Sequence, residues 1–165
     1  TMRNAILPIL DRLNPKKIVV ASSAPPIRYP DCYGIDMATL HELVAFRALI
    51  DILQEHDDME FLETCYREAK RQLSLPADEQ TNCLKKLYER CTDEELETAI
   101  AKRLKPKDMR AEFQVVFQTC RDLRRSCPNH TGDWYFTGNY PTPGGFRVVN
   151  QALVNYVERN YERAY

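Results

Sequence analysis

A short apolar run that ends in two prolines constrains the fold of this chain more than any other feature. Residues 18–21 read Ile-Val-Val-Ala, and Ser-Ser-Ala-Pro-Pro follows at residues 22–26. Because no polar residue interrupts the run, we expect a strand covered on both faces, as in a parallel sheet. The prolines end that strand and stiffen the loop. Ligands of open α/β sheets bind beyond the carboxyl ends of strands, so the loop is either a binding site or only a rigid connection.

Helical periodicity dominates the rest of the chain. The predicted elements are helices at residues 2–13, 39–55, 59–73, 84–91, 92–104, 119–127 and 146–161, a second strand at residues 112–118, and an irregular aromatic segment at residues 132–145. Pro8 is expected to kink the first helix or delay its start. Thr39 with Glu42, and Thr92 with Glu95, have the spacing of capping boxes and predict two helix starts. A helix, a turn and a buried strand at the beginning form half of a βαβ crossover. The fold class is therefore predicted to be α/β with few parallel strands.

The helices of residues 57–108 have narrow apolar faces and heavily charged opposite faces. We interpret this stretch as a mostly helical insertion that packs as a small satellite bundle. It divides the chain into a first part, residues 1–56, and a return to the same core with a final helix, residues 109–165.

Charge and composition exclude several classes of protein. The formal net charge of −1 gives no electrostatic basis for binding nucleic acid or an anionic membrane. No apolar run approaches the ~20 residues that span a bilayer, and the first residues lack a signal-peptide pattern. The six cysteines have no compact spacing, which favours a reduced, cytoplasmic protein. The few glycines form neither a phosphate-binding P-loop nor a dinucleotide fingerprint.

Two motifs carry a resemblance to a known family. The first contains a small-residue loop with a proline at residues 22–25, then Arg28, Tyr29-Pro30, and Tyr-Gly-Ile-Asp at residues 33–36. The second reads Phe-Thr-Gly-Asn-Tyr-Pro-Thr at residues 136–142. In this order they resemble the end of the phosphoribosyltransferase domain of the amidophosphoribosyltransferases. The resemblance covers about the first fifty residues and residues 112–156, and implies a partial type I phosphoribosyltransferase fold around the helical insertion.

The resemblance implies a role in the first step of de novo purine synthesis, in which phosphoribosyl pyrophosphate (PRPP) and glutamine give 5-phosphoribosylamine. In the family, a substrate loop ending in Arg-Gly-Thr-Thr precedes the region matched here, and Thr1 aligns with its last threonine. We therefore expect this chain to be a C-terminal part that is inactive alone. Its partners would be the glutaminase and PRPP-loop segments of the same chain, in a homo-oligomer, with Mg²⁺ ligands upstream. The alternatives are a non-catalytic helical interaction module and a nucleotide-binding regulator.

Four residues are the candidate site residues, and none is expected to be catalytic. The resemblance implies that Ser22, Ser23 and Asp36 form part of the wall of the nucleotide and PRPP pocket, and that Leu43 lines the channel that carries ammonia. Each has a structural alternative. Serines are common where strands end, a carboxylate is favoured at a helix N-terminus, and Leu43 suits a helix core.

Metal binding is not predicted within this chain. Some members of the family hold an iron–sulfur cluster, and their ligand positions correspond here to Asp31, Gly132 and Tyr135, none of which is a thiolate. Cys32 lies one position away, so no Fe–S cluster is predicted. Cys120, Cys127 and His130 have spacing too loose to indicate zinc.

Overall fold

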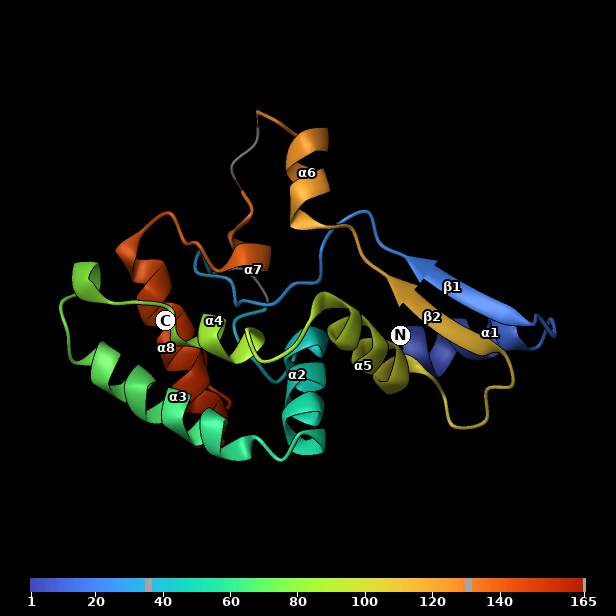
Figure 1. The fold of residues 1–165 in the computed structure, drawn as a ribbon, viewed down its shortest axis with the longest axis horizontal. Coiled ribbons are helices and arrows are strands. Elements are labelled where there is room, and N and C mark those ends of the chain that lie inside the picture. Colours follow the sequence, from blue (N-terminus) through green and yellow to red (C-terminus); the bar gives the residue numbers. More distant parts are fainter. Residues whose placement is uncertain (35–36, 130–131, 165) are drawn as a thin grey trace.

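The computed structural model describes residues 1–34, 37–129 and 132–164. These residues form an α/β fold with one sheet of two parallel strands, β1 (Lys17–Ala21) and β2 (Glu112–Val116). The strands pair in register from Lys17 opposite Glu112 to Ala21 opposite Val116. The sheet and the N-terminal helix lie at one end of an elongated molecule, and α5 (Asp93–Leu104) lies between the sheet and the main group of helices (Figure 1). The predicted α/β class with few parallel strands is confirmed.

Only one face of the sheet is covered by the described residues, so the expectation of a strand buried on both faces is wrong. Ile18 is buried with Leu7 of the first helix, and Val115 belongs to the main core. On the opposite face Val19 is 52% exposed and Val116 is 38% exposed. The apolar run correctly predicted the strand, but burial depends on which elements cover each face.

The α-helical part of the N-terminal helix starts late, directly before Pro8, which is one of the two outcomes expected for this proline. A π-helical turn, η1 (Met2–Ile6), leads into α1 (Leu7–Asp11), and Pro8 lies in the first turn of α1. The carboxylate of Asp11 accepts hydrogen bonds from the backbone N–H of Ala111 at 3.0 Å and of Arg110 at 3.2 Å. These two bonds are the main reason that the pKa of Asp11 is lowered. The helix thereby fixes the chain just before β2.

The next helix begins later than its sequence pattern predicted. α2 (Val44–Glu55) has Leu43 as its N-cap residue, without a side-chain cap. Thr39 donates to Glu42 at 3.1 Å, but in a turn before the helix. The prediction that these residues cap the helix is therefore wrong, because the same side-chain spacing also suits an isolated turn.

Residues 57–108 form α3 (Met59–Leu73), η2 (Ala77–Glu79), α4 (Cys83–Tyr88) and α5. At the start of α5, the predicted capping box is confirmed: the N–H of Glu95 donates to Thr92 Oγ1 at 3.2 Å, and the N–H of Thr92 donates to Glu95 Oε2 at 2.7 Å. These helices share one hydrophobic core with α2 and α8 (Pro143–Val157). They are therefore no satellite bundle, because their narrow apolar faces are completed by α2 and α8.

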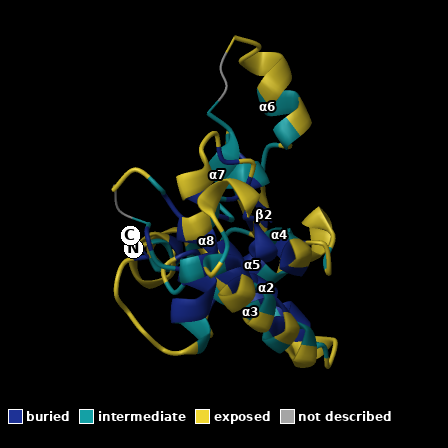
Figure 2. Cartoon of the chain, turned by 90° about the vertical axis from the view of Figure 1, so that its left-hand side faces the viewer, coloured by how far each residue is buried: buried dark blue, intermediate teal, exposed yellow. Residues whose placement is uncertain are grey.

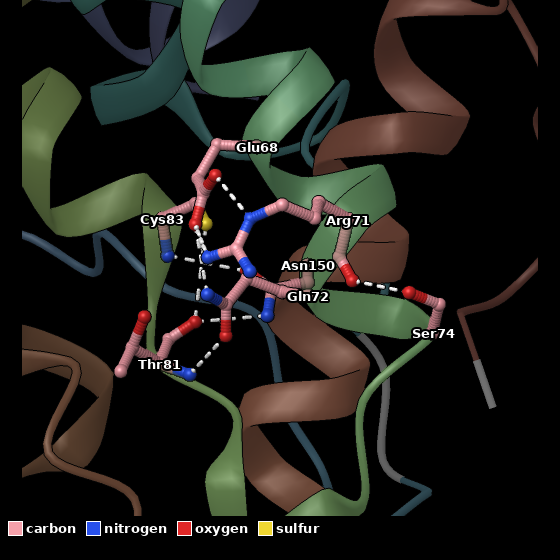
Figure 3. Close-up of polar contacts among 7 residues, drawn as sticks. All are labelled: Glu68, Arg71, Gln72, Ser74, Thr81, Cys83 and Asn150. Atoms are coloured by element: carbon pink, nitrogen blue, oxygen red, sulfur yellow. Dashed lines mark hydrogen bonds and ion pairs between the residues drawn. The ribbon is translucent and has the colours of Figure 1, made fainter.

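Buried polar groups join these helices to α8 (Figure 3). Asn150 of α8 is fully buried, accepts from the N–H of Cys83 at 3.1 Å and donates to the carbonyl of Thr81 at 2.9 Å. Gln72 of α3 accepts from the N–H of Thr81 at 2.7 Å and donates to Glu68 at 2.8 Å. Each amide satisfies backbone groups that the core would otherwise leave without partners.

The remaining helices are short. α6 (Cys120–Ser126) has no buried residue and stands away from the body of the molecule (Figure 2). The side chain of Thr119 caps its start, because the N–H of Asp122 donates to Thr119 Oγ1 at 3.0 Å. α7 (Trp134–Thr137) interrupts the expected irregular segment. No helix in the described ranges is long and apolar enough to cross a membrane.

Candidate functional site

The loop after β1 is held in place by the side chain of Ser22, the first residue of the loop. The hydroxyl of Ser22 donates to the carbonyl of Ala24 at 2.8 Å and accepts from the N–H of Ala24 at 3.2 Å. Because a serine hydroxyl has only one proton, its donor is used within the loop. Ser23 is exposed and takes no part in these bonds. Asp36 lies outside the described residues.

A cavity of about 370 Å³ lies at the carboxyl ends of both parallel strands. Its lining comes from the loop after β1, the segment before α2, the end of β2, and α7. The lining residues are Ser22, Ala24, Pro25, Pro26, Ile27, Met37, Glu42, Leu43, Val44, Phe117 and Phe136. Two of the predicted residues, Ser22 and Leu43, thus come together, and Ser23 is not among them. The position is the one in which open α/β sheets bind ligands.

The lining of this cavity is apolar apart from Ser22 and Glu42. None of the described residues that line it carries a positive charge, and the donor of Ser22 is already used. A phosphate needs several strong donors when it leaves water. The described lining therefore suits a neutral guest better than an anion. The sequence prediction missed Phe117 and Phe136. It placed Phe117 inside a strand of residues 112–118, whereas β2 ends at Val116 and Phe117 follows it at the carboxyl edge of the sheet.

The two motif segments, a hundred residues apart in sequence, are bonded to each other. The N–H groups of Arg28 and Tyr29 donate to the carbonyl of Tyr135 at 2.9 and 3.1 Å. The hydroxyl of Tyr140 donates to the carbonyl of Pro30 at 2.6 Å. The motifs therefore form one structural unit beside the cavity, and their aromatic residues hold it together.

A buried carboxylate lies at the centre of this unit. Asp31 is fully buried and accepts from the hydroxyl of Tyr135 at 2.7 Å and from the N–H of Tyr33 at 2.9 Å. Burial and the bond to Asp31 raise the pKa of Tyr135 to about 12. Asp31 and Tyr135 occupy two of the three positions that correspond to iron–sulfur ligands in some members of the family. Here these positions carry a carboxylate and a phenol that are hydrogen-bonded to each other.

The side chain of Cys32 is half-buried, and burial raises the pKa of its thiol. This opposes the thiolate form that a metal would require. Within residues 1–34, 37–129 and 132–164, no three His, Cys, Asp or Glu side chains are arranged to hold a metal ion. His130, considered with Cys120 and Cys127, lies outside the described residues.

Two helices of the stretch at residues 57–108, α4 and α5, also contact the first motif. The guanidinium of Arg28 pairs with Asp93 at the start of α5, and the carbonyl of Arg28 accepts from the hydroxyl of Tyr88 of α4 at 3.0 Å. Tyr88 is buried, which raises the pKa of its hydroxyl well above the ordinary value and keeps it a donor. No sequence pattern predicted these contacts, because Tyr88 and Asp93 lie in the stretch that the family resemblance does not cover.

The parallel strands and the cavity at their carboxyl ends define an α/β protein, consistent with a partial phosphoribosyltransferase-like fold. Three known proteins match the chain, and each is named amidophosphoribosyltransferase. The Pasteurella multocida protein is 58% identical over 36 residues, 22% of this chain and 7% of that protein. The Haemophilus influenzae protein is 39% identical over 71 residues, which is 41% of this chain and 14% of that protein. The Escherichia coli protein is 36% identical over 55 residues, 33% and 11%.

These matches confirm that part of this chain is related to the amidophosphoribosyltransferases. The matched stretches span between 7% and 14% of the length of these relatives. No family model matches the chain, and no solved structure matches it significantly.

Proposed function

We propose that this chain forms part of the phosphoribosyltransferase domain of an amidophosphoribosyltransferase. The observation that carries the proposal is the hydrogen bond from the Tyr140 hydroxyl of the second motif to the Pro30 carbonyl of the first, beside a cavity at the carboxyl ends of β1 and β2. Motifs that resemble one family are thus parts of one structural unit at a ligand-binding position. The names of the three relatives support the same function.

The reaction is the conversion of PRPP and glutamine to 5-phosphoribosylamine, in the cytoplasm. The pyrophosphate loop, the Mg²⁺ ligands and the glutaminase site belong to segments that have no match in these 165 residues. Those segments, within a homo-oligomer, are its partners, and neither nucleic acid, membrane nor an Fe–S cluster takes part. The chain alone therefore makes no phosphoribosylamine, and synthesis by the isolated chain would contradict this proposal.

Within that reaction, the apolar cavity excludes water from the path of ammonia. Leu43 and Val44 form part of its wall, and an apolar wall keeps ammonia neutral. Ser22 fixes the loop through its bonds to Ala24, so we assign it a positioning role. Ser23 and Asp36 are the proposed contacts to PRPP or nucleotide.

A graft into the Escherichia coli relative tests the proposal. Residues 17–43, which contain the first motif, replace the segment of that relative that carries the corresponding motif, and phosphoribosylamine formation is measured with glutamine and separately with free ammonia. The graft is expected to retain both activities. A second graft with Leu43→Gln is expected to lose about tenfold more glutamine-dependent than ammonia-dependent activity, because a polar wall admits water.

The matched control is Leu43→Met, which keeps the volume and polarity of the wall and should keep both activities. Equal loss of both activities in the Leu43→Gln graft would show that Leu43 is only a packing residue. A folded graft that makes no product from either nitrogen source would overturn the proposed function.

A further inference from the structure

A second hollow, of about 670 Å³, lies between α5 and the outer edge of β2, away from the cavity described above. Its lining residues are Glu94, Glu97, Thr98, Ala101, Lys102 and Lys105 of α5 and the following turn, and Phe113, Gln114 and Val115 of β2. We call it the edge groove. Nothing in the proposed function uses it.

Backbone groups of β2 point into this groove. The ladder to β1 uses even-numbered residues: the N–H of Glu112 donates to Lys16 at 2.9 Å, and that of Gln118 donates to Ser22 at 3.2 Å. Alternation therefore turns the N–H and C=O groups of Phe113 and Val115 to the outer edge. The next odd-numbered residue, Phe117, supports this, because its N–H donates to Glu97 of α5 at 2.9 Å.

The two ends of the groove carry opposite charges. Glu97 lies at the end of β2 through its bond to Phe117, whereas Leu104 packs, like Phe113 at the beginning of the strand, against the small core cluster that contains Ile18 and Ala111. α5 therefore runs antiparallel to β2. Glu94 and Glu97 make one end of the groove acidic, and Lys105 makes the other end basic, whereas the charge of Lys102 is paired with Glu55 of α2.

The spacing of these charges matches an extended chain. Glu97 and Lys105 are eight residues apart, which is about 12 Å along a helix at ~1.5 Å per residue. Four steps of a β-strand span about 14 Å at ~3.4 Å per step. A five-residue strand laid on β2 can thus place its first and last side chains near the two charged ends.

We propose that the edge groove binds an extended peptide as a third strand of the sheet. The peptide has a basic residue at its N-terminal end and an acidic residue at its C-terminal end. It runs antiparallel to β2, which is the more stable pairing and brings its basic end to Glu97 and its acidic end to Lys105. Main-chain bonds to Phe113 and Val115 supply affinity, and the charges fix the direction.

The probe is a labelled peptide, Lys-Val-Thr-Val-Glu, titrated with the 165-residue chain and followed by fluorescence anisotropy. A peptide with lysine at both ends should bind several-fold more weakly, and one with proline at its centre about tenfold more weakly, because proline removes a ladder donor. The amide resonances of Phe113 and Val115 should shift on binding.

Two threonines give a matched pair of variants. Thr98 lies in the groove and Thr64 lies on α3, and both are exposed and donate to the carbonyl four residues earlier. Thr98→Trp should abolish binding by filling the groove, whereas Thr64→Trp should leave it unchanged. Lys105→Glu should reverse the preference, so that the peptide with two lysines binds better.

Three results would overturn the proposal. They are no binding at millimolar peptide, resonance shifts confined to other surfaces, or equal loss of binding in both tryptophan variants. A fourth contradicting result would come from sedimentation of the chain without peptide. If the chain self-associates and Thr98→Trp abolishes this, the groove binds a second copy of the chain instead of a peptide. None of these results bears on the grafts that test the proposed function.

Discussion

The helical block of residues 57–108 meets the rest of the molecule in two different ways. Around Asn150 its contact with α8 is closed, and buried amides satisfy the backbone of residues 81–83 (Figure 3). Along β2 its contact is open: a hollow of about 670 Å³ remains, and the backbone N–H of Phe117 donates across it to the side chain of Glu97. We call these the closed seam and the open seam.

The difference between the seams shows how stability and binding are divided in this chain. A closed seam with fully satisfied polar groups fixes one arrangement, because separating it leaves buried donors and acceptors without partners. At an open seam, changing one side chain costs little folding stability. The backbone groups there are available to a bound peptide. Substitutions should therefore act mainly on folding at the closed seam and mainly on binding at the open seam.

The largest expected effect is at Asn150 of the closed seam. Asn150→Ala removes the partners of Cys83 and Thr81 inside the core, and should lower the free energy of unfolding by about 4 kcal/mol. Urea denaturation followed by circular dichroism measures this. The control is Asn139→Ala, at an exposed residue that bonds Lys85, which should cost less than about 0.5 kcal/mol. Equal effects would remove the distinction between a closed seam and ordinary surface.

The second effect is at the start of α8. A Cβ on Gly145 would lie 2.4 Å from Cβ of Tyr140, whereas a Cβ on Gly144 has only Thr142 near it, at 3.9 Å. Gly145→Ala should therefore destabilise the chain by about 2 to 3 kcal/mol. Gly144→Ala should be neutral or stabilising by up to about 1 kcal/mol, since alanine favours helix. Thermal denaturation of both variants measures the difference. Similar melting temperatures would contradict the close approach of Gly145 to Tyr140.

A smaller effect is expected at the open seam. Glu97→Ala removes the acceptor of the Phe117 N–H and should cost about 1 kcal/mol in urea denaturation. Glu97→Gln retains an acceptor and should recover most of that loss. Glu94→Ala, also in the groove, should change stability by less than about 0.5 kcal/mol. A loss at Glu97 as large as that at Asn150 would mean that both seams carry stability alike.

The smallest effect concerns pH. The bonds from Arg71 and then Gln72 lower the pKa of Glu68 to about 2. Because this pKa is below the unfolded value, the contribution is present above about pH 4.5 and disappears as pH falls toward 2. Glu68→Gln should therefore flatten the fall in melting temperature over this range. Arg71→Met should flatten it too, and the double variant should add little; additive changes would show that the pair is not the cause.

Much of the secondary structure follows from sequence patterns, because the causes are local. The apolar run at residues 18–21 became β1, and Thr92 with Glu95 capped α5 through bonds between neighbours in the chain. Where a pattern was ambiguous, the prediction failed: Thr39 and Glu42 bond each other in a turn, and α8 begins at Pro143 instead of Phe146.

The candidate site was predictable only in part. Ser22 and Leu43 do come together at one cavity, but the use of the Ser22 hydroxyl by Ala24 depends on the geometry of the loop. The aromatic wall at Phe117 and Phe136 comes from segments about a hundred residues away. No local pattern specifies such neighbours.

The sequence by itself determined the α/β class, the strand with its proline-stiffened loop, and the two motifs related to the amidophosphoribosyltransferases. These depend on periodicity, on backbone restriction by proline and on residue order, which act within a few residues. Only the tertiary structure decided that the motifs bond through Pro30 and Tyr140, and that the helical block shares the main core. It also decided that one sheet face stays exposed and that the open seam keeps its hollow. These outcomes depend on contacts between distant segments, whose packing sets which surfaces and polar groups are covered.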